Sequence, residues 1–107
     1  MSELPVVVVG AGPIGLAAAA HLRERGLEPL VLERGDVAGA AVAQWRSVRT
    51  FSRWAELIDP AARRLLDTTG WQAPDDDAYP TGQAWAGQYL TPLADALGDA
   101  VRLDHEV

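Results

Sequence analysis

Four valines at residues 6–9 lead without interruption into the glycine-rich hexamer Gly10-Ala11-Gly12-Pro13-Ile14-Gly15. Such a short β-branched run, with no alternating polar residues, predicts a strand buried on both faces, as in a parallel sheet. Residues 16–25 are rich in alanine and leucine and predict a helix with Pro13 in its first turn. Residues 29–33 predict a second buried strand. The sequence thus indicates a strand–turn–helix–strand unit of about 30 residues, the size of one βαβ crossover.

Helix signals continue further along the chain. Asp59 followed by Pro60 is typical of a helix start, and Gly70 marks the end of that helix. Thr81 predicts the start of another helix, which Pro92 should kink or split. Its apolar stripe has a spacing of four residues: Trp85, Tyr89, Leu93 and Leu97. We expect residues 35–53 to be irregular, residues 71–83 to form a surface loop and residues 100–107 to start a third strand.

These elements predict an α/β fold, a Rossmann-type parallel sheet of strand order 3-2-1 with helical crossovers. The order follows because a right-handed crossover places the third strand beside the second. Residues 35–83 would form a loop-and-helix insertion before the third strand. A three-stranded parallel sheet with open edges is poorly protected, so we expect residues 1–107 to be the N-terminal part of an incomplete dinucleotide-binding domain.

Each glycine of the hexamer has a distinct role in a dinucleotide site. Gly10 permits a tight turn, Gly12 lets a diphosphate approach the main chain, and Gly15 lets the helix pack closely on the sheet. The pattern also has the required context, because a predicted strand precedes it, a predicted helix follows it, and Glu33 comes eighteen residues after Gly15. The hexamer therefore predicts a phosphate-binding turn.

The helix start and the second strand complete this predicted site. Pro13 and Ile14 lie in the first helical turn, where unpaired N–H groups face the phosphates. Glu33 can accept hydrogen bonds from an adenosine ribose, and its carboxylate would repel a 2′-phosphate. The site therefore disfavours NADP and leaves FAD or NAD open.

Composition excludes several other classes of function. The chain has no cysteine, which excludes disulfides, cysteine-ligated metals and thiol redox catalysis within these residues. All nine basic residues are arginine, which excludes a P-loop lysine or a Schiff-base lysine. A net charge of −6 argues against a broad basic surface, so we expect no nucleic-acid partner. No residue stands out as a catalytic acid, base or nucleophile, and we expect no metal site.

The apolar stretch over residues 4–22 is not typical of a membrane or secretion signal. No positively charged segment precedes it, and prolines and glycines interrupt it. We expect no membrane partner and a cytoplasmic location. His21 and His105 are interpreted as surface or packing residues, and Asp75-Asp76-Asp77 as a solvated loop.

Residues 5–35 resemble the N-terminal FAD-binding segment of two-dinucleotide-domain flavoproteins, which include flavin-containing monooxygenases and pyridine nucleotide–disulfide oxidoreductase-like enzymes. Residues 44–97, with AQWRSVRTFSRW and IDPAARRLLDTTGWQAP, resemble bacterial FAD/NAD(P)-binding oxidoreductases of that superfamily. The resemblance implies that the glycine turn meets the FAD diphosphate, Glu33 the ribose and Arg34 the adenine side. Trp45 and Arg46 are candidate contacts to the flavin or a phosphate.

The resemblance implies the FAD-binding N-terminal portion of an NAD(P)H-dependent flavin oxidoreductase, a monooxygenase or a reductase. NAD(P)H would be the co-substrate, and the remainder of the flavoprotein fold would be the partner of this segment. We expect the 107 residues by themselves to be inactive. Two alternatives stay open: an NAD-dependent dehydrogenase whose nucleotide site lies here, and a truncated, non-catalytic nucleotide-binding module.

Overall fold

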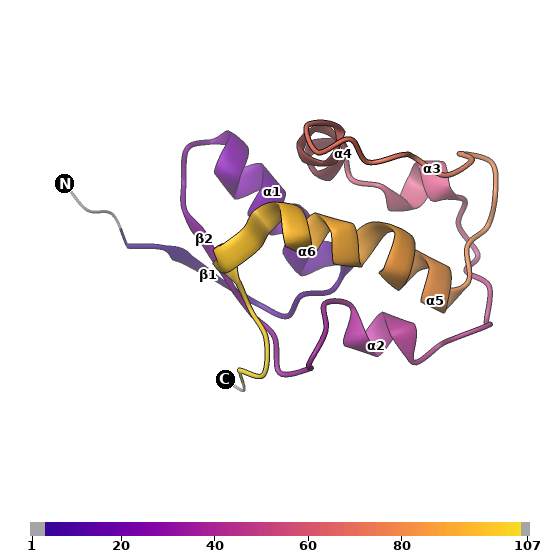
Figure 1. Cartoon of the computed structure of the whole chain (residues 1–107), viewed down its shortest axis with the longest axis horizontal. Coiled ribbons are helices and arrows are strands. Elements are labelled where there is room, and N and C mark those ends of the chain that lie inside the picture. Colours follow the sequence, from indigo (N-terminus) through magenta and orange to yellow (C-terminus); the bar gives the residue numbers. More distant parts are fainter. Residues whose placement is uncertain (1–3, 106–107) are drawn as a thin grey trace.

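The structure is a computed structural model that describes residues 4–105. Helices and short strands alternate along the first part of the chain, and helices dominate the rest (Figure 1). The elements are β1 (Val6–Val9), α1 (Pro13–Glu24), β2 (Pro29–Leu32), α2 (Ala40–Ala43), α3 (Trp54–Leu57), α4 (Pro60–Asp67), α5 (Gly82–Trp85), the π-helical turn η1 (Ala86–Leu90), α6 (Thr91–Leu97), the 3-10 turn η2 (Gly98–Ala100) and β3 (Val101–Arg102).

The three strands form one parallel sheet in the order β1-β2-β3. Val8 of β1 pairs with Val31 of β2, which pairs in turn with Val101 of β3. Counted from the other edge, this is the predicted order 3-2-1. The α/β class, the parallel sheet and the helical crossovers are therefore confirmed.

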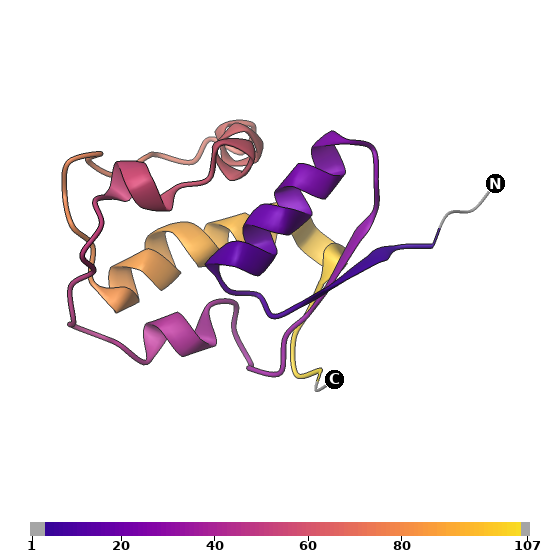
Figure 2. The same ribbon diagram turned by 180° about the vertical axis from the view of Figure 1, so that it is seen from behind.

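The core lies between the sheet and a layer of packed helices. α1 contacts β1 and β2 on one side and α4 and α6 on the other, and Figure 2 brings α1 to the front of this layer. The largest fully buried side chains come from both layers: Tyr89, Leu16, Leu66, Leu90, Leu93 and Val31. Most of the predicted apolar stripe is thus in the core, whereas Trp85 is half-buried.

β1 differs from its prediction, because it is not buried on both faces. Val8 packs against the core, whereas Val7 is 54% and Val9 67% exposed. Within residues 4–105, β1 pairs with β2 alone, and the helix packed on it, α1, covers only one face. The four-valine run specifies a strand correctly, but burial depends on what covers that strand.

The structure also contains two short helices that the sequence does not predict. α2 lies inside the segment expected to be irregular, and α3 follows it before Asp59. α2 begins after Gly39, which has a φ of 72°. No apolar pattern in the neighbouring sequence indicates this conformation. β3 has two residues, and residues 106–107 of the predicted strand lie outside the described part.

The predicted helix caps are confirmed. Asp59 Oδ2 accepts a 2.9 Å hydrogen bond from the N–H of Ala62 at the start of α4. Thr81 Oγ1 accepts one of 3.1 Å from the N–H of Ala84 at the start of α5. Both helices thus begin at side chains that accept the otherwise unpaired amides of a first turn. α1 begins at Pro13 and ends before Gly26, which has a φ of 75°.

Pro92 alters the helix without breaking it. Figure 1 shows α5, η1 and α6 as one continuous helical rod. Just before Pro92, the N–H of Thr91 donates to the carbonyl of Ala86, which makes a π-helical turn. Because proline has no N–H, the regular bond from residue 92 to the carbonyl of Gln88 cannot form. The wider turn accommodates this loss.

Among residues 4–105, no helix combines the length and the apolar character that crossing a bilayer requires.

Candidate functional site

A cavity of about 640 Å³ lies at the carboxyl ends of β1 and β2. Ligands of open parallel α/β sheets bind at this end of the strands. The cavity brings together seven of the nine predicted site residues: Gly10, Gly12, Pro13, Ile14, Gly15, Glu33 and Arg34. The remainder of its wall comes from the ends of the two strands, from the start of α2 and from His105.

The three glycines have the geometry that their predicted roles require. Gly10 has a φ of 95°, in the left-handed region that favours glycine. A methyl group on Gly12 would meet no heavy atom within 4 Å beyond its chain neighbours, so open space faces this part of the main chain. A methyl group on Gly15 would overlap the carbonyl oxygen of Gly10 and lie 3.3 Å from Val8 Cγ1. Gly15 is therefore needed for the close approach of α1 to β1.

The N-terminus of α1 points its amides into this space without a side-chain cap. Gly12 is the N-cap residue and has no side chain to accept a hydrogen bond. Pro13 is the first helical residue, and the first turn contains no acidic side chain. The amides and the positive end of the twelve-residue helix dipole are therefore available to an anion.

Glu33 is tied to the main chain at both carboxylate oxygens. Its Oε1 accepts a 2.8 Å hydrogen bond from the N–H of Ala11, inside the glycine turn. Its Oε2 accepts one of 2.7 Å from the N–H of Gly35. Each carboxylate oxygen has a second lone pair, so Glu33 can still accept hydrogen bonds from a ribose. The spacing of residues in the sequence does not indicate the contact with Ala11.

His105 is a cavity residue that the sequence interpretation assigned to surface or packing. The main-chain N–H of His105 donates a 2.8 Å hydrogen bond to the main-chain carbonyl of Glu33, and this bond holds His105 beside the end of β2. Its Nδ1 lies 2.6 Å from the carbonyl oxygen of Leu103. A carbonyl can only accept, so Nδ1 carries the proton and Nε2 is the acceptor of the neutral ring. The available signal was its position after the third strand, since the carboxyl ends of parallel strands meet at one edge.

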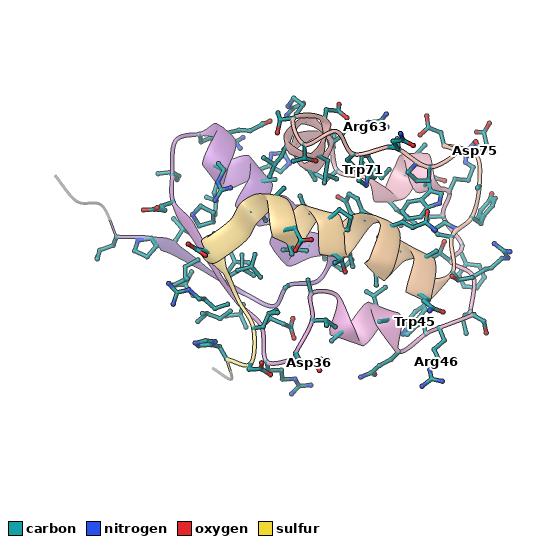
Figure 3. All side chains as sticks on the ribbon, in the orientation of Figure 1. Asp36, Trp45, Arg46, Arg63, Trp71 and Asp75 are labelled. Carbon is teal, nitrogen blue, oxygen red and sulfur yellow. The ribbon has the colours of Figure 1, made fainter. Side chains whose placement is uncertain are left out.

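Trp45 and Arg46 do not line the cavity. They follow the last residue of α2, whereas the cavity wall includes α2 only up to Val42. Figure 3 shows them at the opposite side of α2 from Asp36. Trp45 is 56% exposed, and Arg46 has a φ of 44°. Their contact with a cofactor stays a prediction.

A second polar cluster lies among the helices, outside the cavity. His21 Nε2 of α1 is 2.9 Å from Asp59 Oδ1, and the N–H of Asp59 donates to the hydroxyl of Tyr89 over 3.2 Å. Burial acts to raise the pKa of Asp59, but the hydrogen bond from Ala62 and the contact with His21 outweigh it and lower the pKa. Burial raises the pKa of Tyr89. This cluster joins α1, α4 and η1, and its role is structural.

No group of three or more metal-binding side chains gathers anywhere in the part of the chain that the structure describes.

Comparison with known proteins finds one matching family and several oxidoreductases that are similar to this chain. The sequence profile of the NAD(P)-binding Rossmann-like domain matches residues 8–69. The chain is 37% identical to the glycine oxidase of Pseudomonas aeruginosa, over 79% of this chain and 26% of that protein. It is 51% identical to an indole-3-pyruvate monooxygenase of Oryza sativa subsp. japonica, over 90% of this chain and 22% of that protein. The chain thus spans about a quarter of the length of these relatives.

A solved structure supports the same grouping. A steroid monooxygenase bound to NADP superposes with a TM-score of 0.68 and 26% identity, over 92% of this chain and 19% of that one. These matches confirm the resemblance to oxidoreductases that residues 5–35 indicated.

Proposed function

The chain belongs to the NAD(P)-binding Rossmann-like domain family, and on that premise we propose that its cavity binds the ADP half of FAD. The diphosphate would lie against Gly12 and the start of α1, and the ribose against Glu33. Arg34 and His105 would contact the adenosine from the outer wall. The chain would then be the FAD-binding N-terminal portion of an NAD(P)H-dependent flavin oxidoreductase.

One observation carries this proposal. The open main chain at Gly12 and the carboxylate of Glu33 line the same cavity at the carboxyl ends of the strands. One wall is suited to a diphosphate, which N–H groups bind, and the other to a ribose, whose hydroxyls donate to a carboxylate. A dinucleotide carries both groups next to each other.

Redox chemistry in this fold requires a cofactor, because the sequence has no cysteine and no other redox-active side chain in the cavity wall. Such a cofactor supplies transfer of a hydride from NAD(P)H and delivery of the electrons to oxygen or to an organic acceptor. The chain's own residues would bind and orient it.

The proposal extends to Trp45 and Arg46 as contacts of the flavin half. The cavity runs along α2 from Gly39 to Val42, and Trp45 follows three residues later. An FAD molecule whose diphosphate lies at Gly12 would have to extend along α2 beyond Val42 to contact Trp45. The names of the relatives, an oxidase and a monooxygenase, support an oxidoreductase but leave its acceptor open.

We further propose that residues 1–107 act together with further parts of a flavoprotein, in the cytoplasm. The chain spans about a quarter of the length of its relatives, and residues that hold NAD(P)H and substrate would come from those further parts.

The direct test is to titrate the 107-residue chain with ADP and follow its amide signals by NMR. We expect the amides of Gly10, Gly12 and Gly15 to shift and FAD to displace ADP. NADP should compete about tenfold less well than NAD, because of the charge of Glu33. Shifts confined to another surface would contradict the proposal.

The absorbance spectrum of the protein isolated from its natural source distinguishes an FAD site from an NAD site. We expect visible flavin absorbance that denaturation releases into the filtrate. A colourless protein that saturates with NADH would instead support an NAD-dependent dehydrogenase.

A further inference from the structure

Glu33 lies at the centre of a network that fixes the glycine turn. Its carboxylate joins two segments, because Ala11 belongs to the turn after β1 and Gly35 to the loop after β2. The two bonds, of 2.8 and 2.7 Å, have the short lengths of charge-assisted hydrogen bonds. The contact with Ala11 spans 22 positions of sequence, so it is tertiary rather than local.

Ala11 is the residue whose position determines that of Gly12. It is fully buried, and its carbonyl accepts a 2.8 Å hydrogen bond from the N–H of Gly39. On its other side, the N–H of Gly10 donates over 2.7 Å to the carbonyl of Leu32. The turn is thus held on both sides of the Ala11 N–H, and Glu33 supplies the bond to that N–H.

We propose that Glu33 is a positioning residue for the diphosphate as well as a ligand of the ribose. By holding the N–H of Ala11, it fixes the main chain of Gly12 in the orientation that a diphosphate meets. Ribose binding does not release this bond, because each carboxylate oxygen keeps a free lone pair. The inference rests on the proposed function, since it assumes that a diphosphate binds at Gly12.

The positioning role and the charge of Glu33 act on a diphosphate in opposite directions. A carboxylate near a diphosphate repels it, so removing the charge alone should tighten binding. Removing the bond to Ala11 should loosen the turn and weaken binding. A ligand that has no ribose separates these effects, because a role limited to the ribose then contributes nothing. Inorganic pyrophosphate is such a probe.

The test uses Glu33→Gln with Glu28→Gln as the matched control. The amide introduced by Glu33→Gln would place an NH₂ group against one of two N–H donors and lose that hydrogen bond. Glu28 is exposed at the other end of β2, lies outside the cavity and undergoes the same change of charge. Glu33→Asp is the second variant, because it keeps the charge but is one methylene too short to span both amides. It also provides a readout if the glutamine variant folds poorly.

Amide hydrogen exchange without ligand measures the bond itself. We expect the protection of Ala11 to fall about tenfold in Glu33→Asp, whose shorter side chain reaches only the nearby N–H of Gly35. In Glu33→Gln the protection should fall at whichever of Ala11 and Gly35 faces the NH₂ group. Both should stay unchanged in Glu28→Gln, with Val31 of β2 reporting an intact fold. Unchanged protection of Ala11 and Gly35 would overturn the proposal.

Pyrophosphate titration followed by phosphorus NMR measures the consequence. We expect the dissociation constant to rise about tenfold in Glu33→Gln and Glu33→Asp. Unchanged or tighter pyrophosphate binding by Glu33→Asp, which keeps the charge but loses the bond to Ala11, would overturn the positioning role. A wild-type chain that binds no pyrophosphate would contradict the proposed function, and this failure is distinguishable because the exchange measurement needs no ligand.

Discussion

The indole N–H of Trp71 donates a 2.9 Å hydrogen bond to the main-chain carbonyl of Gln88. This carbonyl lies in η1, and it is the one that Pro92 cannot serve in a regular α-helix. Trp71 also packs against Tyr89, with ring centroids 6.4 Å apart, and Arg63 lies over its ring. Figure 3 labels Trp71 and Arg63 beside α4. Trp71, in the loop after α4, therefore supplies a hydrogen-bond donor to the carbonyl of Gln88, which Pro92 leaves without its regular helical donor.

Trp71→Phe should lower the free energy of unfolding by about 1 kcal/mol, because it removes this donor and keeps an aromatic ring. Trp45→Phe is the control, since Trp45 is exposed and the same change there should fall within about 0.5 kcal/mol of wild type. Urea denaturation followed by circular dichroism measures both. Equal effects at the two positions would mean that the bond to Gln88 contributes nothing.

Substitutions at the glycines should separate nucleotide binding from folding. Gly12→Ala should leave the free energy of unfolding within about 0.5 kcal/mol of wild type, because its methyl group meets open space. The same methyl group would occupy the place of the diphosphate, so ADP affinity should fall at least about tenfold. Isothermal titration with ADP measures this loss.

Two further glycines serve as references in that series. Gly15→Ala should fold poorly, because its methyl group would overlap the carbonyl of Gly10. Gly87 is exposed and a methyl group there meets no neighbour within 4 Å, so Gly87→Ala should change neither property beyond a small gain in stability. A Gly12→Ala protein that binds ADP as well as Gly87→Ala does would exclude Gly12 from the site.

Asp59 should make the stability of the chain depend on acid pH. Its pKa is lowered in the folded chain, so the unfolded chain binds more protons between the two pKa values. The stabilisation is therefore complete above the ordinary value of 3.8 and is lost as the pH falls through the folded pKa. Asp59→Asn keeps an oxygen that can cap α4 but removes the charge, so it should be less stable by about 1 kcal/mol at pH near 6 and equal to wild type near pH 2.

The exposed Asp36→Asn provides the comparison for Asp59, since it removes a carboxylate of the same kind that neither caps a helix nor contacts His21. Denaturation curves across this pH range check the prediction. A constant difference between wild type and Asp59→Asn at every pH would contradict it.

His105 should contribute to nucleotide affinity through Nε2, the acceptor of the neutral ring. His105→Ala should weaken ADP binding about fivefold, and His105→Gln, which keeps an acceptor near that position, should restore most of it. His21→Gln makes a similar change outside the cavity and should leave ADP affinity unchanged. Identical affinities for wild type and His105→Ala would remove His105 from the site.

The sequence predicts best what local rules determine. The caps at Asp59 and Thr81 and the glycine turn each depend on a few neighbouring residues, and all are present in the structure. The strand order also follows, because crossover handedness leaves little choice. The cavity therefore contains seven of the residues expected there.

The sequence predictions are wrong or incomplete where contacts between segments distant in sequence determine the structure. Burial of β1 depends on whether another element packs over Val7 and Val9, and the identity of these two residues does not indicate whether one does. His105 joins the cavity only because β3 pairs with β2, and the bond from Ala11 to Glu33 requires the assembled turn. Four-residue helices such as α2 are too short for a periodic pattern to identify.

The outward side chains of Val7 and Val9 have a practical consequence for anyone who handles this chain in solution. They stand beside main-chain groups at a strand edge, and hydrophobic edges of that kind promote self-association. Turbidity from aggregation should therefore appear sooner in concentrated samples than in dilute ones. A dye that fluoresces on binding hydrophobic surfaces should become more fluorescent when the folded chain is added.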